Sequence, residues 1–141
     1  MLLEELKQQT RQQHAALEQL NGLPQSLVDY LGLLESFFGF VEPWERSVAR
    51  QLPPDDPIRA GREKNSWLRD DLAYFGYSAS AVAALPRCDD LPPLSSRAAI
   101  LGAAYVLEGS TLGGQFIARH LAQTLDLKPG EGCRYFLSYG P

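Results

Sequence analysis

Residues 3–18 place a histidine among side chains that could hold a flat, anionic, metal-bearing ligand. Apolar or small residues recur there at steps of three and four, which predicts one inward helical face, made of Leu3, Leu6, Thr10, His14 and Leu17. Arg11 and Lys7 lie about one and two turns before His14. A neutral imidazole binds metals, and nearby cations attract carboxylates. A lone histidine on such a face is nevertheless more often a hydrogen-bonded core residue, so both interpretations stay open.

A second candidate feature is a glycine-rich stretch inside a long helical pattern. Gly109, Gly113 and Gly114 lie within six positions, with apolar helical periodicity on both sides and no proline. Each glycine destabilises a helix by about 1 kcal/mol relative to alanine. The stretch therefore indicates a bend, a close approach to a ligand, or close packing of two helices through the pair Gly109 and Gly113. His120 follows the glycines, and we expect it to be a surface or structural residue.

Together the two segments resemble the bacterial, biliverdin-producing heme oxygenases. The pattern Leu-Lys-x-x-Thr-x-x-x-His-x-x-x-Glu at Leu6–Glu18 is similar to the proximal helix of that family. The run Leu107–Gln115 is similar to its kinked, glycine-bearing distal helix. Weaker similarities at residues 30–39, 68–72 and 135–140 come in family order, so the resemblance covers almost the whole chain.

The resemblance implies a role for each candidate site residue. His14 would be the axial ligand of the iron of heme b, Glu18 would orient its ring, and cations on the same helix would face the heme propionates. The implied cofactor-binding residues are Lys7, Arg11, His14, Glu18, Gly109, Gly113 and Gly114. The implied catalytic residues are Gly109, Ser110 and Gly113. Animal members carry an acidic residue at the Ser110 position, so the proton-delivering group here stays open between Ser110, Thr111 and bound water.

The resemblance implies an enzyme for which heme is both substrate and cofactor. Such an enzyme opens heme to biliverdin with release of CO and ferrous iron, using O2 and electrons from a ferredoxin or reductase. A non-catalytic heme-binding protein of the same fold and a helical interaction module are alternatives. A thiaminase-type helical enzyme is a further one, although it would need a nucleophilic cysteine in a helical pocket, whereas Cys88 and Cys133 lie in or beside predicted loops.

The composition is that of one globular domain spanning residues 1–141. The chain is 45% hydrophobic and 21% charged, with a formal net charge of −4, which argues against a general nucleic-acid binder. No apolar run is long enough to insert into a membrane, and no secretory signal pattern is present. The two cysteines lack metal-site spacing. These features favour a cytoplasmic protein.

The periodicity predicts an all-α, heme-oxygenase-like multi-helical bundle. Helices are expected at residues 2–20, from Ser26 or Asp29 to a kink or split at Pro43, at 62–75, at 80–85, and from Ser95 or Ser96 to about residue 125. The first should stop at residues 21–24, Asn-Gly-Leu-Pro. The Gly-Pro at 140–141 is where a further helix would begin, so we expect the bundle to lack its last helical segment here.

Overall fold

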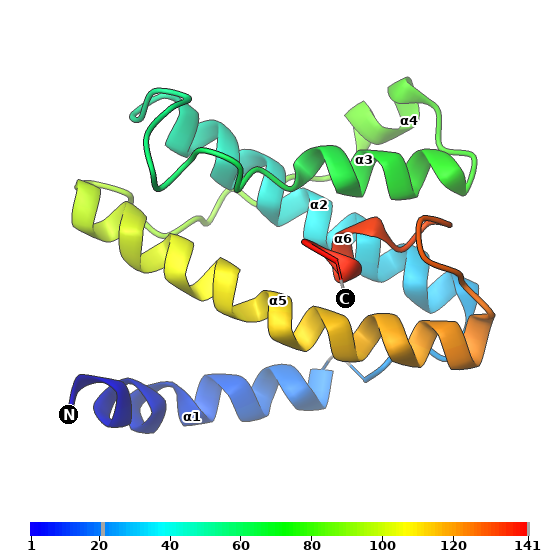
Figure 1. The fold of residues 1–141 in the computed structure, drawn as a ribbon, viewed down its shortest axis with the longest axis horizontal. Helices are drawn as coiled ribbons and strands as arrows, with labels where there is room; N and C mark the ends of the chain where they lie inside the picture. The colour runs from blue at the N-terminus through cyan, green and yellow to red at the C-terminus, as the bar shows by residue number, and fades with distance from the viewer. Residues whose placement is uncertain (21, 141) are drawn as a thin grey trace.

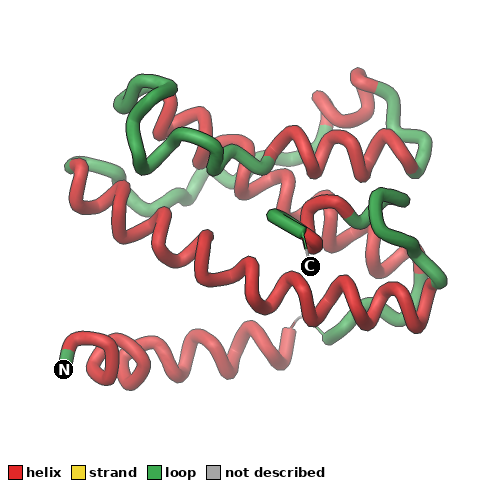
Figure 2. The backbone as a smooth tube through the Cα atoms, in the orientation of Figure 1, coloured by secondary structure: helices red, strands yellow, loops and turns green. Residues whose placement is uncertain are grey.

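Helices are the only regular secondary structure among the residues that the computed structural model describes, 1–20 and 22–140, as the sequence predicts (Figures 1 and 2). The helices are α1 (Leu2–Leu20), α2 (Leu27–Ala49), α3 (Asn65–Tyr74), α4 (Ala79–Ala84), α5 (Arg97–Leu125) and α6 (Arg134–Leu137). Asn21, part of the predicted stop at residues 21–24, lies outside the described residues, as does Pro141 of the Gly-Pro pair at 140–141. No described helix is long and apolar enough to cross a membrane.

Two buried apolar clusters hold α5 at its two ends. The first joins α2, α3 and α6 to the second half of α5 through residues such as Phe38, Leu72 and Leu121. The other joins the end of α2 to the first half of α5, which contributes Ile100 and Ala104. No residue of α5 between Ala104 and Gly114 is buried. Figure 1 shows α5 changing direction in this middle part, as the glycines lead one to expect.

Pro43 does not split α2, contrary to one predicted outcome. The helix runs continuously from Leu27 to Ala49. Because proline has no N–H, the carbonyl of Gly39 loses its normal partner four residues later. The N–H of Cys88 donates to that carbonyl instead, at 2.8 Å. The loop after α4 thus docks where the proline frees a backbone acceptor, and a side chain at Gly39 would collide with the carbonyl of Pro86.

A buried carboxylate sets the start of α3. Glu45 of α2 accepts hydrogen bonds from the backbone N–H groups of Lys64, at 2.5 Å, and Asn65, at 3.2 Å. These are unpaired donors at the start of the helix. The helix therefore begins at Asn65 rather than near residue 62, where sequence periodicity alone placed it.

A second buried carboxylate starts α6, a short helix that the sequence pattern did not predict. Asp71 of α3 accepts from the backbone N–H groups of Arg134, at 2.7 Å, and Tyr135, at 2.9 Å. The helix has only four residues, too few to show periodicity. Its position therefore depends on a tertiary contact, Asp71 with residues 134–135.

The prediction that one face of α1 packs inward against the protein is wrong. Leu3, Leu6 and Leu17 keep 50%, 43% and 53% of their surface exposed, and His14 is exposed as well. Figure 1 shows α1 on the opposite side of α5 from α2, α3 and α6. None of the other described helices, α5 included, packs extensively against α1.

We expect Asp71→Ala to lower the free energy of unfolding by about 2–4 kcal/mol, because two backbone donors lose a charged, buried acceptor. Asp70→Ala is the matched control, since Asp70 forms only an exposed ion pair with Arg134 and should change stability by less than about 1 kcal/mol. Urea unfolding measures both. Equal losses in the two variants would contradict the role given to Asp71.

Candidate functional site

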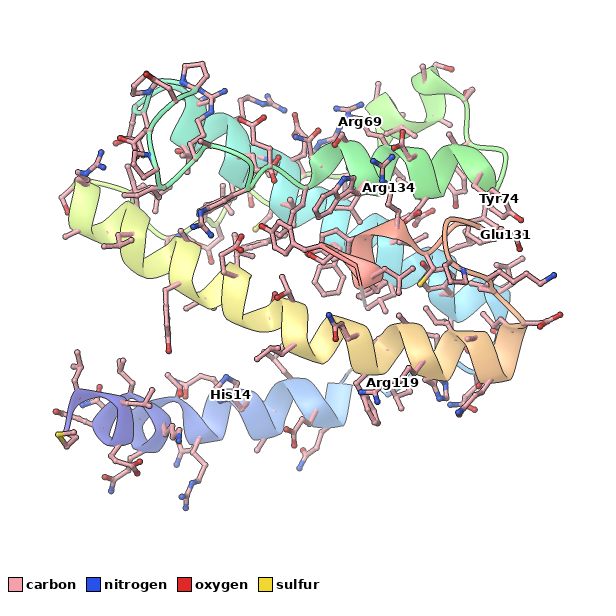
Figure 3. All side chains as sticks on the ribbon, viewed as in Figure 1. His14, Arg69, Tyr74, Arg119, Glu131 and Arg134 are labelled. Carbon is pink, nitrogen blue, oxygen red and sulfur yellow. The ribbon has the colours of Figure 1, made fainter. Side chains whose placement is uncertain are left out.

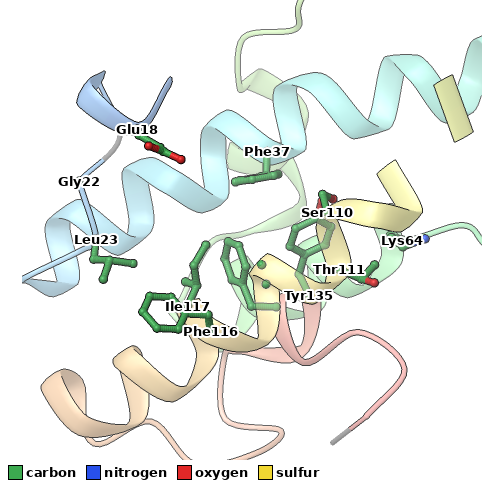
Figure 4. A pocket seen from close by; sticks show the side chains of 13 residues that line it. Glu18, Gly22, Leu23, Phe37, Lys64, Ser110, Thr111, Phe116, Ile117 and Tyr135 are labelled. Atoms are coloured by element: carbon green, nitrogen blue, oxygen red, sulfur yellow. The ribbon is translucent and has the colours of Figure 1, made fainter. Parts of the chain in front are cut away.

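A pocket of about 620 Å³ lies beside the middle of α5 (Figure 4). Its walls come from the end of α1 and the loop after it, from α2, from α5 and from α6. Phe37, Phe116, Ile117 and Phe136 make much of this wall apolar. The volume lies within the range of about 300–1,000 Å³ that is usual for small-molecule sites.

The structure brings together half of the predicted site residues around this pocket. Glu18, Ser110, Gly113 and Gly114 line it. Lys7, Arg11, His14 and Gly109 are not among the lining residues. All four are exposed, on α1 or on the part of α5 next to the pocket.

The three glycines of the 109–114 stretch of α5 serve two different purposes. A Cβ added at Gly109 or Gly113 would meet no atom within 4 Å other than those of the adjoining residues and the nearby backbone of α5. A Cβ at Gly114 would lie 3.0 Å from the carbonyl oxygen of Phe136. Gly114 therefore allows α6 to approach α5, whereas Gly109 and Gly113 contact no described helix. Close helix packing through Gly109 and Gly113 has no support in the described residues.

The hydroxyls of Ser110 and Thr111 donate to their own helix. Ser110 Oγ donates to the carbonyl of Leu107 at 2.6 Å, and Thr111 Oγ1 donates to that of Glu108 at 2.7 Å. Their hydrogens are thus engaged, but each oxygen keeps lone pairs that can accept a hydrogen bond. In this arrangement both residues can hold a water molecule in the pocket as acceptors.

An exposed apolar stripe continues from the pocket along α5. Leu101, Tyr105, Leu112 and Phe116 are exposed and follow helical spacing, and Gly109 occupies the remaining place in the series. Phe116 belongs both to this stripe and to the pocket wall. Figure 1 shows α1 and the first half of α5 extending toward the same end of the molecule. Figure 3 shows His14 on α1.

The cations of α1 are free to meet a ligand. Lys7 approaches Glu4 at 3.9 Å, but both side chains are largely exposed, so the pair is weak. Arg11 is exposed too. His120, by contrast, joins α5 to the loop before α2, because its Nε2 lies 2.8 Å from the carbonyl oxygen of Pro24. This contact agrees with the structural role expected for His120.

A polar cluster at the pocket edge was missed by sequence reasoning. Lys64 Nζ donates to Glu108, to the carbonyl of Arg62 at 3.0 Å and to the hydroxyl of Tyr139 at 3.0 Å, although its side chain is only 6% exposed. Tyr139 donates to Glu108 Oε2 at 2.9 Å, and Arg62 lies 3.3 Å from the same carboxylate. A charged residue directly before Gly109, in an otherwise apolar pattern, is the sequence feature that could have revealed Glu108.

The cluster keeps Glu108 ionised. Burial acts to raise the pKa of Glu108, but hydrogen bonds from Lys64 and Tyr139 and the charges of Lys64 and Arg62 outweigh it, so the pKa lies below its ordinary value. The pocket edge therefore carries a compensated ion pair rather than a free charge.

Comparison with known proteins identifies the family of the chain. Residues 1–140 match the family model described as Heme oxygenase. The chain belongs to the heme oxygenase family. A protein of Xanthomonas campestris pv. campestris (strain 8004) named "Heme oxygenase" is 50% identical over 54 residues, which are 38% of this chain and 28% of that protein. No solved structure matches the chain.

Gly113 and Gly114 have different surroundings. Alanine substitutions at these two positions should therefore change the stability of this heme oxygenase family member in opposite directions. Gly113→Ala meets open space, so it should raise the free energy of unfolding of the ligand-free protein by about 0.5–1 kcal/mol. Gly114→Ala has the same helical advantage, but its Cβ must displace Phe136, so we expect a net loss of about 1 kcal/mol or more. Chemical unfolding measures both, and the same sign for the two would show that the contact assignment is wrong.

Proposed function

We propose that the chain binds heme between α1 and the middle of α5 and opens it to biliverdin, CO and ferrous iron. The observation that carries the proposal is the open space over Gly109 and Gly113 in the unburied middle of α5, beside an apolar pocket that the end of α1 also borders. Family membership supports heme as the ligand. O2 and electrons from a separate ferredoxin or reductase would be the other requirements.

The residues present suit a porphyrin. A flat apolar ring can lie against a helix only where side chains leave room, and Gly109 and Gly113 leave that room. The exposed stripe of α5 and the exposed leucines of α1 would lose contact with water when such a ring is between them. Phe37 and Phe136 present apolar aromatic surface at the pocket wall.

We assign α1 the polar contacts of the ligand. His14 would bind the iron through one ring nitrogen, and Glu18, one turn later at the pocket wall, would accept a hydrogen bond from the other. Lys7 and Arg11 would pair with the propionates. Because α1 has few contacts of its own, heme binding should also stabilise its position.

Heme, when bound, supplies the redox-active iron at which O2 reacts with the ring. The chain contributes binding, orientation and restricted access. A ring lying against Gly109 and Gly113 would leave room for little beyond O2 on the α5 side, and the apolar wall would limit the access of bulk water. Ser110 and Thr111 would accept hydrogen bonds from a water that carries protons to the site.

The cysteines do not favour thiaminase-type chemistry. Burial raises the pKa of the Cys133 thiol to about 11, so little of it is thiolate at neutral pH. Neither Cys133 nor Cys88 lines the main pocket.

A test of ring opening distinguishes an enzyme from a non-catalytic heme-binding protein. Hemin-loaded protein, given a reductant under air, should form biliverdin. Stable binding without ring opening would favour the non-catalytic alternative.

We expect His14→Ala to abolish the absorption spectrum of histidine-ligated hemin, and added imidazole to restore it in part, because His14 would supply the axial nitrogen. His120→Ala is the matched control and should keep the wild-type spectrum, since His120 contacts Pro24. Titration of each protein with hemin measures the effect. An unchanged spectrum in His14→Ala would exclude this residue as the ligand.

A large side chain at Gly113 should block the α5 side of the site. Gly113→Leu is expected to weaken hemin binding about tenfold or more, corresponding to about 1.4 kcal/mol, or to stop turnover, with helix content nearly unchanged. Gly32→Leu is the control, because Gly32 is an exposed glycine of α2 that also has open space around it. Normal hemin affinity and normal biliverdin formation in Gly113→Leu would refute the assignment of α5.

A further inference from the structure

Two contacts from the C-terminal segment flank the glycine stretch of α5. Glu108, directly before Gly109, accepts a hydrogen bond from the hydroxyl of Tyr139, at 2.9 Å to Oε2. Gln115, directly after Gly114, donates through Nε2 to the carbonyl of Gly140, at 3.1 Å. The two ends of the stretch are thus held by two neighbouring residues of another segment.

This geometry restricts how α5 can bend. From Glu108 to Gln115 the helix rises about 10 Å, at about 1.5 Å per residue. The side chain of Tyr139 and the backbone of Gly140 together span this distance, and the carbonyl of Phe136 lies against Gly114 between them. A change of curvature within the glycine stretch would therefore lengthen at least one of the three contacts.

Lys64 connects these contacts to the core. Its buried ammonium donates to Glu108 and to Tyr139, and it lies 5.1 Å from the centre of the Tyr139 ring. The backbone N–H of Lys64 is itself held by Glu45 of α2. The Tyr139 ring also packs nearly perpendicular to the Trp67 ring of α3, with ring centres 5.7 Å apart. Glu108 and Tyr139 are thus fixed against both α2 and α3.

We propose that Glu108 and Tyr139, held by Lys64, are positioning residues that fix the curvature of the α5 glycine stretch and so its distance from α1. Their effect on the ligand rests on the proposed function, because it is heme that would lie against Gly109 and Gly113. Their effect on the curvature of α5 does not depend on the proposed function. Neither residue needs to touch the ligand, since both act through the backbone of residues 109–114.

Amide hydrogen exchange of the ligand-free full chain tests the effect on α5. Tyr139→Phe removes the hydroxyl but keeps the ring on Trp67, and Glu108→Gln removes the charge. Both should accelerate exchange at residues 110–116 by about threefold to tenfold, with α3 unchanged. Tyr139→Phe loses one hydrogen bond, and Glu108→Gln loses the charge that strengthens the bonds from Lys64 and Tyr139. Tyr77→Phe is the matched control, because it removes another tyrosine–carboxylate bond, to Glu35 at 2.5 Å, away from α5. Exchange at residues 110–116 that equals the wild type in Tyr139→Phe would overturn the proposal.

The hemin complex tests the positioning role. The pH midpoint of the absorption change of bound hemin depends on the polar surroundings of the iron, and we expect it to shift in Tyr139→Phe and not in Tyr77→Phe. Faster exchange with an unshifted midpoint would overturn positioning of the ligand, and leave only a structural contact. Failure of the wild type to bind hemin would overturn the proposed function and the positioning of that ligand. Faster exchange in Tyr139→Phe would, even then, support control of α5 curvature by Tyr139.

Discussion

The middle of α5 is open on one side and held by contacts on the other, and the packing around this helix depends on that difference. Gly109 and Gly113 leave space beside the pocket, whereas Gly114 accepts the backbone of Phe136. Glycines weaken a helix, so a helix that needs them requires support from its neighbours. The apolar clusters supply that support at the two ends of α5, and the contacts of Glu108, Gly114 and Gln115 supply it in the middle.

Buried carboxylates place the segments that provide this support. Glu45 binds the start of α3 and Asp71 the start of α6, so each satisfies N–H groups that a helix leaves unpaired. Glu108, which is only partly buried, completes the arrangement from α5 through its ion pair with the buried Lys64. Such groups are costly to bury alone but rigid when fully hydrogen-bonded, which suits a wall that must keep its shape. On the other side of α5, α1 has no comparable anchor among the described residues.

Local patterns in the sequence predicted most of the helices, and long-range contacts account for most of the differences. Capping by Ser96 and the long periodicity predicted α5 well. The effect of Pro43 was not predictable, because the Cys88 N–H that takes its place comes from a distant loop. The pairing of Lys64 with Glu108 is likewise tertiary, and its partners lie 44 residues apart. For α1, periodicity identified an apolar face but could not show that protein side chains leave it exposed.

The proposed heme site is tested most directly by a crystal structure of the hemin complex, with the iron located by its anomalous scattering. We expect a single iron between α1 and α5, bound by a ring nitrogen of His14, with the porphyrin in contact with the backbone at Gly109 and Gly113. Iron bound by His120, or a porphyrin held away from these glycines, would show that the site is wrongly placed.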